Sequence, residues 1–318
     1  MRKAILLYNP LSGRRQHRRL ADVEAALSVL HAAGIEASSA ATRADGGTAE
    51  QVSNAIAQRC DAVFACGGDG TIHDVLQGLV GTKTALGIIP LGTANSLAHD
   101  LGMPPSPTRA AQAALTAAPR RIAVGRVEYR GFGGKPSSRY FTVAAGIGVD
   151  AHLFYKLNPL AKRRLGMMAY YVKATRLWLT HKMEHFAVEL PENDQTRPAE
   201  VSQLLAVRIQ NFGGVLRELA PGASLERNDL RLVLFHTRSR AAYLGYILRG
   251  LLGTRWSVPG IELLHSSGVS CRALEQGLPA SSRVLVEADG ELLGTLPAEI
   301  SVVPDAVSLL VPSQQKQA

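Results

Sequence analysis

The sequence predicts an α/β protein with a second, β-rich domain, and three observations support this fold class. The chain has 318 residues, which corresponds to about two domains at roughly 100 to 200 residues per domain. Its first 100 residues alternate short apolar runs with segments of helical periodicity. The second half consists mainly of strand-like runs separated by Gly, Pro, Asn and Ser. We therefore expect a parallel sheet with helices on both faces, followed by an antiparallel β-sandwich with helical inserts.

The N-terminal elements are expected to repeat as strand, helix, strand. Short apolar runs predict strands at residues 4–8, 62–65 and 86–89. Helices are predicted where apolar residues recur every three or four positions: Leu20, Val23, Leu27 and Leu30; Val52, Ala55 and Ile56, with Thr48 as N-cap; and Ile72, Val75, Leu76 and Leu79. A short Ala-rich helix follows residue 107. Repeated βαβ units of this kind form parallel sheets.

The second half predicts a different architecture. Strand-like runs occupy residues 124–129, 140–144, 187–190, 204–209, 230–235 and 284–287, with helical inserts near 165–179 and 241–252 and final strands at 300–303 and 307–311. We expect an α/β domain at residues 1–122, to which the chain end 304–318 is a candidate to return. A β-sandwich domain is expected at 123–303.

Composition narrows the function classes. The formal net charge is +9 and the pI is about 9.7, which favours anionic partners such as nucleotides or an acidic membrane face. Three cysteines without metal-ligand spacing make a disulfide framework and a zinc site unexpected, so we expect a cytoplasmic protein. The longest apolar uncharged stretch, residues 84–99, contains Pro90 and is too short to span a bilayer.

The sharpest chemical signal is the loop Gly67-Gly68-Asp69-Gly70-Thr71, between a predicted strand and a predicted helix. Glycines let the backbone approach a ligand closely, and the start of the helix presents free N–H groups, so the loop is suited to phosphate. Asp69 would repel phosphate by itself, which suggests Mg²⁺ between its carboxylate and a nucleotide. The alternative is a tight connection without a ligand.

Two further loops of small residues follow other strands of the same predicted sheet. They are Asn9-Pro10-Leu11-Ser12-Gly13 and Pro90-Leu91-Gly92-Thr93-Ala94-Asn95. Ligands of open α/β sheets bind at the carboxyl ends of the strands, where these loops are expected. The sequence has no Gly-x-x-x-x-Gly-Lys-Ser/Thr motif and no strand followed by Gly-x-Gly-x-x-Gly, which excludes a P-loop NTPase and a dinucleotide fingerprint.

With these three segments and the distant Asp289-Gly290-Glu291, the chain resembles the diacylglycerol kinase catalytic-domain family of lipid kinases, which includes sphingosine and ceramide kinases. The order and spacing match over nearly the whole chain. Gly-Gly-Asp-Gly-Thr alone is shared with NAD kinases, but the other segments are similar to the lipid branch. The resemblance implies that residues 1–122 form a nucleotide-binding domain and residues 123–303 a lipid-substrate domain. It also implies that the active site lies in a cleft between the two domains and uses ATP and Mg²⁺.

The resemblance also implies roles for individual residues. It implies ATP contacts from Asn9, Pro10, Ser12, Gly13, Thr42, Gly67, Gly68, Asp69, Gly70, Thr71, Thr93 and Asn95. Asp69 would also join the metal through nucleotide and water. Glu291 matches the general base that takes the proton from the lipid hydroxyl. Without the family pattern, Glu291 would be interpreted as a polar residue beside an Asp-Gly hairpin turn.

Two positions depart from the pattern of bacterial relatives. Many of those relatives have an Asp at the start of the second domain that assists the metal network, and this chain has Ala123 there. A structural Mg²⁺ of bacterial relatives lies in an Asp-Asp-Gly loop, and the matching residues here are Glu226, Arg227 and Asn228. We therefore assign no ligands to this second metal.

A basic segment bears on the expected partners. Residues 151–183 contain seven Lys or Arg and no acid, with apolar residues at helical spacing and aromatic residues nearby, a pattern suited to an anionic membrane surface. The alternative is an ordinary packed helix with a solvated face. We expect a lipid kinase peripherally bound to the inner membrane face, with no nucleic-acid partner and with a homodimer left open. The competing functions are a catalytically silent nucleotide- or lipid-binding homologue and a soluble NAD kinase.

Overall fold

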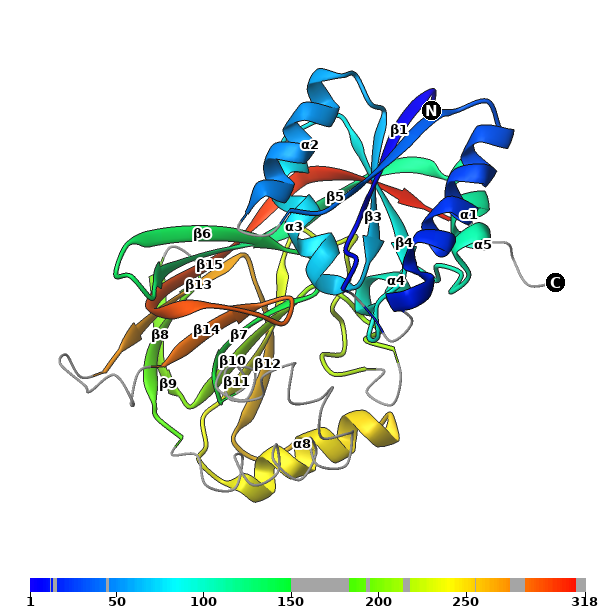
Figure 1. The fold of residues 1–318 in the computed structure, drawn as a ribbon. Helices are drawn as coiled ribbons and strands as arrows, with labels where there is room; N and C mark the ends of the chain where they lie inside the picture. The colour runs from blue at the N-terminus through cyan, green and yellow to red at the C-terminus, as the bar shows by residue number, and fades with distance from the viewer. Residues whose placement is uncertain are drawn as a thin grey trace. The chain divides into compact units, whose positions relative to one another are not determined.

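The computed structural model describes residues 1–11, 13, 16–43, 46–149, 183–192, 195–213, 218–254, 256–274 and 284–312 (Figure 1). The chain divides into two compact units. The first contains Met1–Val124, Asn211–Val215 and Val303–Ala318, and the second contains Gly125–Gln210 and Leu216–Val302. The predicted helix near 165–179 and the basic segment 151–182 lie outside the described residues.

The first unit is built on a parallel sheet. Its strands are β1 (Lys3–Tyr8), β2 (Glu36–Ala41), β3 (Ala62–Gly67), β4 (Ala85–Pro90) and the C-terminal part of β15 (Glu291–Val311), in the order β15-β4-β3-β1-β2. β3 and β4 are buried throughout, as expected for central strands covered on both faces. The chain end therefore adds a strand to the N-terminal sheet, with Ser308 opposite Ala85.

Helices cover both faces of this sheet. α1 (Arg19–Ala32), which follows a short 3₁₀ turn (Gln16–Arg18), packs with α5 (Pro107–Thr116), and α2 (Gly47–Ala57) packs with α3 (Asp69–Leu79). Figure 1 shows the sheet between these two pairs, with the short α4 (Ser96–Asp100) after β4. The predicted face of α3 is confirmed, since Ile72, Val75, Leu76 and Leu79 are all buried.

Two details of the predicted helices are wrong. Leu20 is 58% exposed because the buried face of α1 is formed by Arg19, Val23, Ala26 and Leu30. Leu20 lies about 100° from Arg19 around the helix axis. Thr48 is not the N-cap of α2, a position that Gly46 occupies in the left-handed conformation. Thr48 lies in the first turn instead, where its hydroxyl donates to the Arg43 carbonyl.

The second unit is an antiparallel sandwich. One run of strands is β12 (Ile261–Ser266), β11 (Leu230–Phe235), β10 (Gln203–Val207), β7 (Ala144–Gly148), β14 (Leu285–Ala288) and β15. β15 also pairs with β5 (Ala118–Gly131), which pairs with β6 (Pro136–Phe141), and with β13 (Gly268–Ala273), which continues to β8 (Phe186–Glu192) and β9 (Gln195–Val201). Side chains from both groups of strands share one core that includes Phe141, Phe186, Leu232 and Val286.

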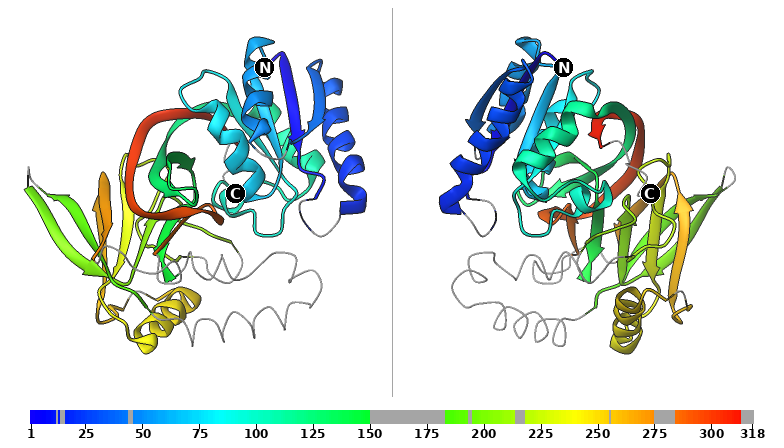
Figure 2. Two further views of the ribbon diagram at one scale, coloured as in Figure 1. Left: turned by 60° about the vertical axis from the view of Figure 1, so that its left-hand side comes forward. Right: turned by 90° about the vertical axis from the view of Figure 1, so that its right-hand side faces the viewer.

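The second-half elements differ from prediction in two places. The single predicted strand at 140–144 spans the end of β6, a bend at Thr142 and Val143, and the start of β7. The two predicted final strands form one strand, β15, which Figure 2 shows as a strongly curved red ribbon. The insert predicted at 241–252 is helix α8 (Arg240–Leu252). No helix among the described residues is both long and apolar enough to cross a membrane.

Candidate active site

The loops after β1, β3 and β4 meet at one edge of the first unit's sheet. Backbone hydrogen bonds join them: Asn9 N–H donates to the Cys66 carbonyl at 3.3 Å, and the N–H groups of Leu91 and Gly92 donate to the Gly67 carbonyl at 2.8 and 3.0 Å. Thr42, at the end of β2, donates its N–H to the Tyr8 carbonyl at 2.8 Å. Parallel pairing therefore places four of the predicted segments at the edge where open α/β sheets bind ligands.

Glycines are required where these loops touch. A Cβ on Gly92 would lie 2.3 Å from the Gly68 Cα, and a Cβ on Gly67 would lie 2.2 Å from the Thr71 Oγ1. Gly13 has a φ of +71°, and a Cβ there would lie 2.3 Å from the Leu91 carbonyl oxygen. The loops are thus held in close contact, and at Gly13 and Gly92 no side chain fits between them.

The start of α3 combines a helix N-terminus with a buried hydroxyl. The N-cap residue, Gly68, is extended and offers no side chain to the first-turn N–H groups. Thr71 is 3% exposed, and its Oγ1 has no hydrogen-bond partner within the described part of the chain. A buried hydroxyl without a partner is energetically unfavourable, so this position is suited to a bound polar ligand.

Asp69 lies half-buried at the first position of α3. Its Oδ1 accepts the Leu97 N–H at 3.4 Å, which links α3 to α4. No group of three or more His, Cys, Asp or Glu side chains that could hold a metal occurs among the residues described. One carboxylate beside a glycine-rich loop fits the way Mg²⁺ is commonly held on nucleotides, by phosphate oxygens and water with few protein ligands.

The loop after β4 is shaped by Asn95. This residue has a φ of 52°, and its side chain accepts the Gly92 N–H at 2.9 Å and donates to the Gly92 carbonyl at 3.2 Å. Thr93 lies exposed at the tip of the same loop. The side chain of Asn95 is therefore engaged in holding the loop that carries Thr93.

Arg19 is a structural member of this edge that the sequence did not single out. Its Nη2 donates to the Leu91 carbonyl at 2.9 Å, and the residue is 3% exposed. Burial lowers the pKa of Arg19 from its ordinary value, with Asp22 opposing the shift. The available signal was the arginine cluster at 14, 15, 18 and 19, but the cluster does not indicate which member turns inward.

Some predicted residues do not join the packed loops. Pro10 is exposed beside Leu11, whose N–H donates to the Asn9 Oδ1 at 2.9 Å. Ser12 lies outside the described residues. Glu291 belongs to the second unit, where it begins β15.

Glu291 follows a two-residue hairpin turn between β14 and β15. Asp289 and Gly290 have φ values of 50° and 83°, as a type I′ turn requires, and Ala288 lies opposite Glu291. The Asp289 carboxylate accepts the N–H groups of Thr142, Val143 and Ala144 at 3.1, 2.9 and 3.2 Å. Asp289 therefore fixes the turn onto the bend between β6 and β7 and positions Glu291, a role that the motif alone did not reveal.

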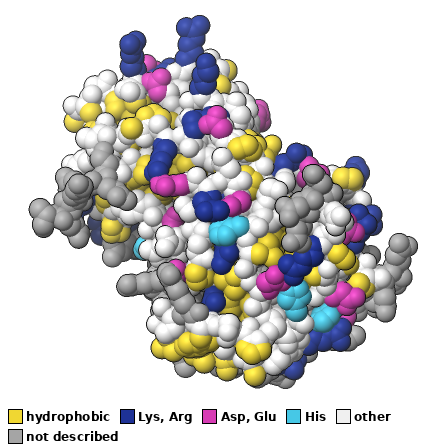
Figure 3. Space-filling model, turned by 180° about the vertical axis from the view of Figure 1, so that it is seen from behind, with side chains coloured by type: hydrophobic (Ala, Val, Ile, Leu, Met, Phe, Trp, Pro, Cys, Tyr) yellow, Lys and Arg dark blue, Asp and Glu magenta, His cyan; other side chains and the backbone are white. Residues whose placement is uncertain are grey.

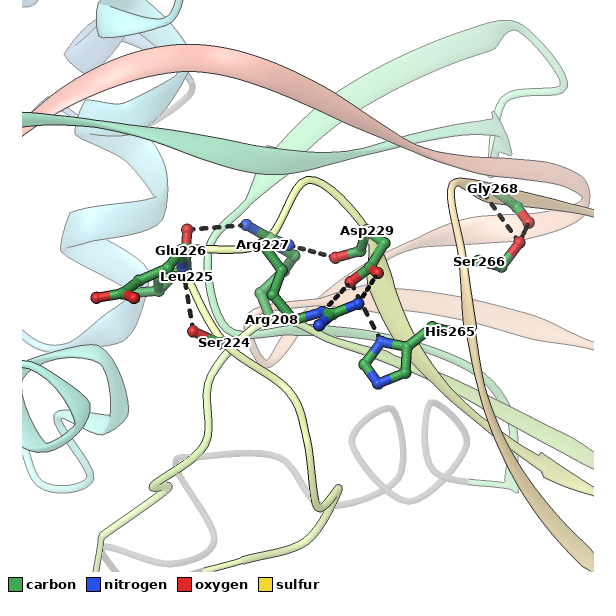
Figure 4. A network of polar contacts seen from close by, with 9 residues as sticks. All are labelled: Arg208, Ser224, Leu225, Glu226, Arg227, Asp229, His265, Ser266 and Gly268. Carbon is green, nitrogen blue, oxygen red and sulfur yellow. Dashed lines mark hydrogen bonds and ion pairs between the residues drawn. The ribbon is translucent and has the colours of Figure 1, made fainter.

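The loop at residues 224–229 provides the test of a second metal (Figure 4). Asp229 receives both the Arg227 side chain, with Nε at 2.8 Å from Oδ1, and the Nδ1 of His265 at 3.2 Å. Arg208, fully buried, donates to the backbone carbonyls of Asp229 and of Leu225. Burial lowers the pKa of Arg208 to about 10, opposed by Asp229. The oxygens that a cation would need are thus already bound to guanidinium groups, and these residues do not fit a structural Mg²⁺.

Ala123 is 3% exposed within β5. It supplies no carboxylate, so the family's assisting Asp has no counterpart at this position.

Comparisons with known proteins match the two halves of the chain to two family models. A family model described as the diacylglycerol kinase catalytic domain matches residues 3–127, and one described as the YegS C-terminal NAD kinase beta sandwich-like domain matches residues 142–311. The chain is 28% identical to a diacylglycerol kinase of Bacillus subtilis (strain 168), over 100% of this chain and 99% of the relative. It is also 28% identical to a diacylglycerol kinase of Staphylococcus haemolyticus, over 94% and 85% of the two chains.

Solved structures show the same fold. The crystal structure of a diacylglycerol kinase from Bacillus anthracis str. Sterne has a TM-score of 0.70 at 20% identity, covering 97% of this chain and 96% of its own. Yeast NADH kinase in complex with NADH has a TM-score of 0.53 at 11% identity, over 100% and 85% of the two chains. At these identities the likeness concerns the fold alone.

Proposed function

Because the chain belongs to the diacylglycerol kinase catalytic-domain family of lipid kinases, we propose that it transfers the γ-phosphoryl group of ATP, with Mg²⁺, to a hydroxyl of a membrane lipid. The acceptor is a diacylglycerol-like lipid or a long-chain base at the cytoplasmic membrane face. One observation carries the nucleotide part of the proposal: the glycine-lined edge of the first sheet, where the buried Thr71 hydroxyl has no partner in the described part of the chain. Family membership supports the lipid as acceptor.

The first unit would bind the nucleotide. Backbone N–H groups at the start of α3 and the Thr71 hydroxyl donate to phosphate oxygens, and the positive end of the helix favours their charge. Asn95 and Arg19 keep the Leu91–Asn95 loop in place for this contact. When bound, Mg²⁺ neutralises charge on the phosphate oxygens, and Asp69 is the described residue of this edge that would hold it directly or through water.

Glu291 would act as general base in the second unit. As the lipid hydroxyl oxygen forms a bond to the γ-phosphorus, the bond from that phosphorus to the bridging oxygen breaks and ADP leaves with its electron pair. The hydroxyl proton moves to the Glu291 carboxylate. A positioned base contributes about 10² to 10⁴-fold to such a step. Asp289 supports this role because its three backbone hydrogen bonds fix the turn that carries Glu291.

The test is phosphoryl transfer from γ-labelled ATP to diacylglycerol, phosphatidylglycerol, sphingosine or ceramide in mixed micelles, with NAD⁺ in a separate lane. We expect labelled lipid with the native protein, a loss of about 10²-fold or more with Glu291→Gln, and no loss with Glu299→Gln, which alters an exposed carboxylate on the same strand. ATP binding without any labelled lipid would contradict the proposal, and labelled NADP⁺ would favour an NAD kinase.

A catalytically silent homologue is the second candidate, because residue 123 in β5 is an alanine and has no carboxylate to assist a metal. Under this alternative the native protein binds ATP without turnover, and Ala123→Asp restores labelled lipid. Strong turnover by the native protein would exclude it.

A further inference from the structure

Among the described residues, helix α8 packs on the second unit through its aromatic face. Tyr243 and Tyr246 are buried, with ring centroids 4.4 and 5.3 Å from that of Phe235 on β11. The Tyr246 hydroxyl donates to the Leu219 carbonyl at 2.6 Å, and the Arg249 guanidinium lies 4.2 Å from the centre of the Tyr246 ring. This aromatic face fixes the position of the helix and determines which side chains face outward.

The outward face of α8 is aliphatic. Leu244, Ile247, Leu248, Leu251 and Leu252 are between 39% and 66% exposed. They recur at intervals of three and four residues and therefore form one continuous stripe. Figure 3 shows hydrophobic side chains gathered at the lower edge of the molecule, the end at which α8 lies in Figure 1. An apolar stripe of this length facing outward is unusual on a protein surface and indicates a binding surface.

Arginine and tryptophan residues flank this stripe along the chain. Residues 236–261 contain four arginines and no acidic residue. Arg238 and Arg240 are exposed at the start of the helix, and Trp256, just beyond its end, is 43% exposed. Leucines in the centre with arginine and tryptophan at the borders are the composition of helices that lie in the interface of an anionic bilayer.

A cavity of about 350 Å³ lies beside the anchored face of α8, near the end of the helix, and offers cationic groups. Its lining includes Arg231, Tyr246, Arg249, Trp256 and Leu263. The Nε atoms of Arg231 and Arg249 are buried and have no hydrogen-bond partner in the part of the chain that the structure describes. Arg249 is 5% exposed. Buried guanidinium donors of this kind are suited to an anionic oxygen group such as a lipid phosphate.

We propose that α8 docks on an anionic phospholipid bilayer, with its aliphatic stripe in the interface and a lipid phosphate in the cavity lined by Arg231 and Arg249. The inference deepens the proposed function, on which it rests, because a kinase acting on membrane lipids must reach the bilayer. A second copy of the chain is disfavoured as occupant of the stripe. A two-fold contact through it would bring together two copies of the segment 236–261, each with four arginines and no acidic residue.

The test is sedimentation of the full-length protein with vesicles of phosphatidylglycerol or of phosphatidylcholine, with no ATP present. We expect binding to phosphatidylglycerol vesicles, at least about tenfold weaker binding for Leu248→Glu/Leu252→Glu, and about fivefold weaker binding for Arg231→Gln. Phe132→Glu, which alters a 54% exposed aromatic residue in the β5–β6 hairpin, should bind like the native protein. Circular dichroism and the melting temperature show whether each variant is folded.

A second measurement avoids the leucine substitutions. The chain has two tryptophans, so Trp178→Phe leaves Trp256 as the only reporter. Its emission should shift to the blue with phosphatidylglycerol vesicles and remain unchanged with phosphatidylcholine vesicles or with inorganic phosphate. Unchanged emission, or native binding by the leucine variant, would overturn the inference. So would a dimer in solution that Leu248→Glu/Leu252→Glu converts to a monomer.

Kinase activity is measured separately on a short-chain lipid in detergent. If the native protein has no kinase activity, the proposed function is refuted and vesicle binding is judged on its own. Retained activity together with unchanged vesicle binding in the leucine variant would refute the role of α8 alone.

Discussion

The two units hold their loops in different ways. At the edge of the first sheet, Gly68 and Gly92 bring backbone against backbone, and the side chains of Asn95 and Arg19 brace the loop from beside this contact. In the second unit, the 224–229 loop is held by the side chains of Arg208, Arg227 and Asp229. A contact between backbones tolerates almost no substitution, whereas a contact between charged side chains can exchange one cation for another. The first kind of site can therefore be recognised from a short motif, and the second requires the structure.

The largest effect is expected from Gly92→Ala, which disturbs the backbone contact of the first unit. The new Cβ would meet the Gly68 Cα at 2.3 Å, so the two loops must separate. A displacement of about 1 Å at a binding site costs on the order of 10²-fold, and we expect a loss of that size in ATP affinity, measured by calorimetry. The control is Gly133→Ala, whose Cβ would meet nothing within 4 Å. Native ATP affinity in Gly92→Ala would show that the contact is not needed for binding.

A smaller effect is expected from Thr71→Val. Valine has nearly the same shape but lacks the hydroxyl that has no partner within the described residues. We expect ATP affinity to fall about tenfold, as for the loss of one hydrogen bond to a charged group, while the melting temperature stays the same or rises. Thr84→Val is the matched control, because its hydroxyl donates to the Cys60 carbonyl at 3.1 Å. That variant should lose stability and keep ATP affinity, and the reverse pattern would refute a nucleotide contact for Thr71.

The fold was predictable where the spacing of apolar residues reflects the burial of a strand or of a helix face. The strands β3 and β4 and the buried face of α3 followed directly from apolar spacing. β2 was not predicted, because its six residues, Glu36–Ala41, are mostly small and polar and lie at the sheet edge. The bend at Thr142 and Val143 was missed for another reason. It depends on hydrogen bonds to Asp289, which lies about 150 residues further along the chain.

The loops of the candidate site were also predictable from the sequence. Glycine motifs identified the loops that the structure brings together at one sheet edge, since positive φ and close approach restrict the residue type. The inward turn of Arg19, the anchoring by Asp289 and the exposure of the aliphatic side of α8 depend on tertiary contacts, and no local pattern specifies them. Whether Glu291 serves as base stays a prediction for the kinase assay.

In the second unit, we expect the 224–229 loop to be stable without a bound metal. Because Arg227 and Arg208 already engage its oxygens, the melting temperature of the native protein should differ by less than about 1 °C between Mg²⁺ and EDTA in the absence of nucleotide. Arg227→Asp removes one guanidinium and adds a carboxylate beside Asp229, so its melting temperature should rise when Mg²⁺ is added. A Mg²⁺-dependent native protein would show that the loop still holds a metal.

The smallest expected effect is the pH dependence of the same loop. The Arg227 side chain, and to a lesser extent His265, lowers the pKa of Asp229 below its ordinary value, and burial opposes the shift. A carboxyl whose pKa is lower in the folded state contributes stability above its unfolded pKa of about 3.9 and loses it as pH falls through the folded pKa. Arg227→Gln removes the largest cause of the shift, so the native protein should melt higher than this variant by a constant margin above about pH 5, and the margin should shrink below about pH 4. Arg272→Gln, which alters a more exposed arginine 3.5 Å from Glu189, controls for the loss of a surface charge. A margin that persists unchanged to pH 3 would mean that Arg227 stabilises the loop by packing, and the contrast between the two units would then rest on Arg208 alone.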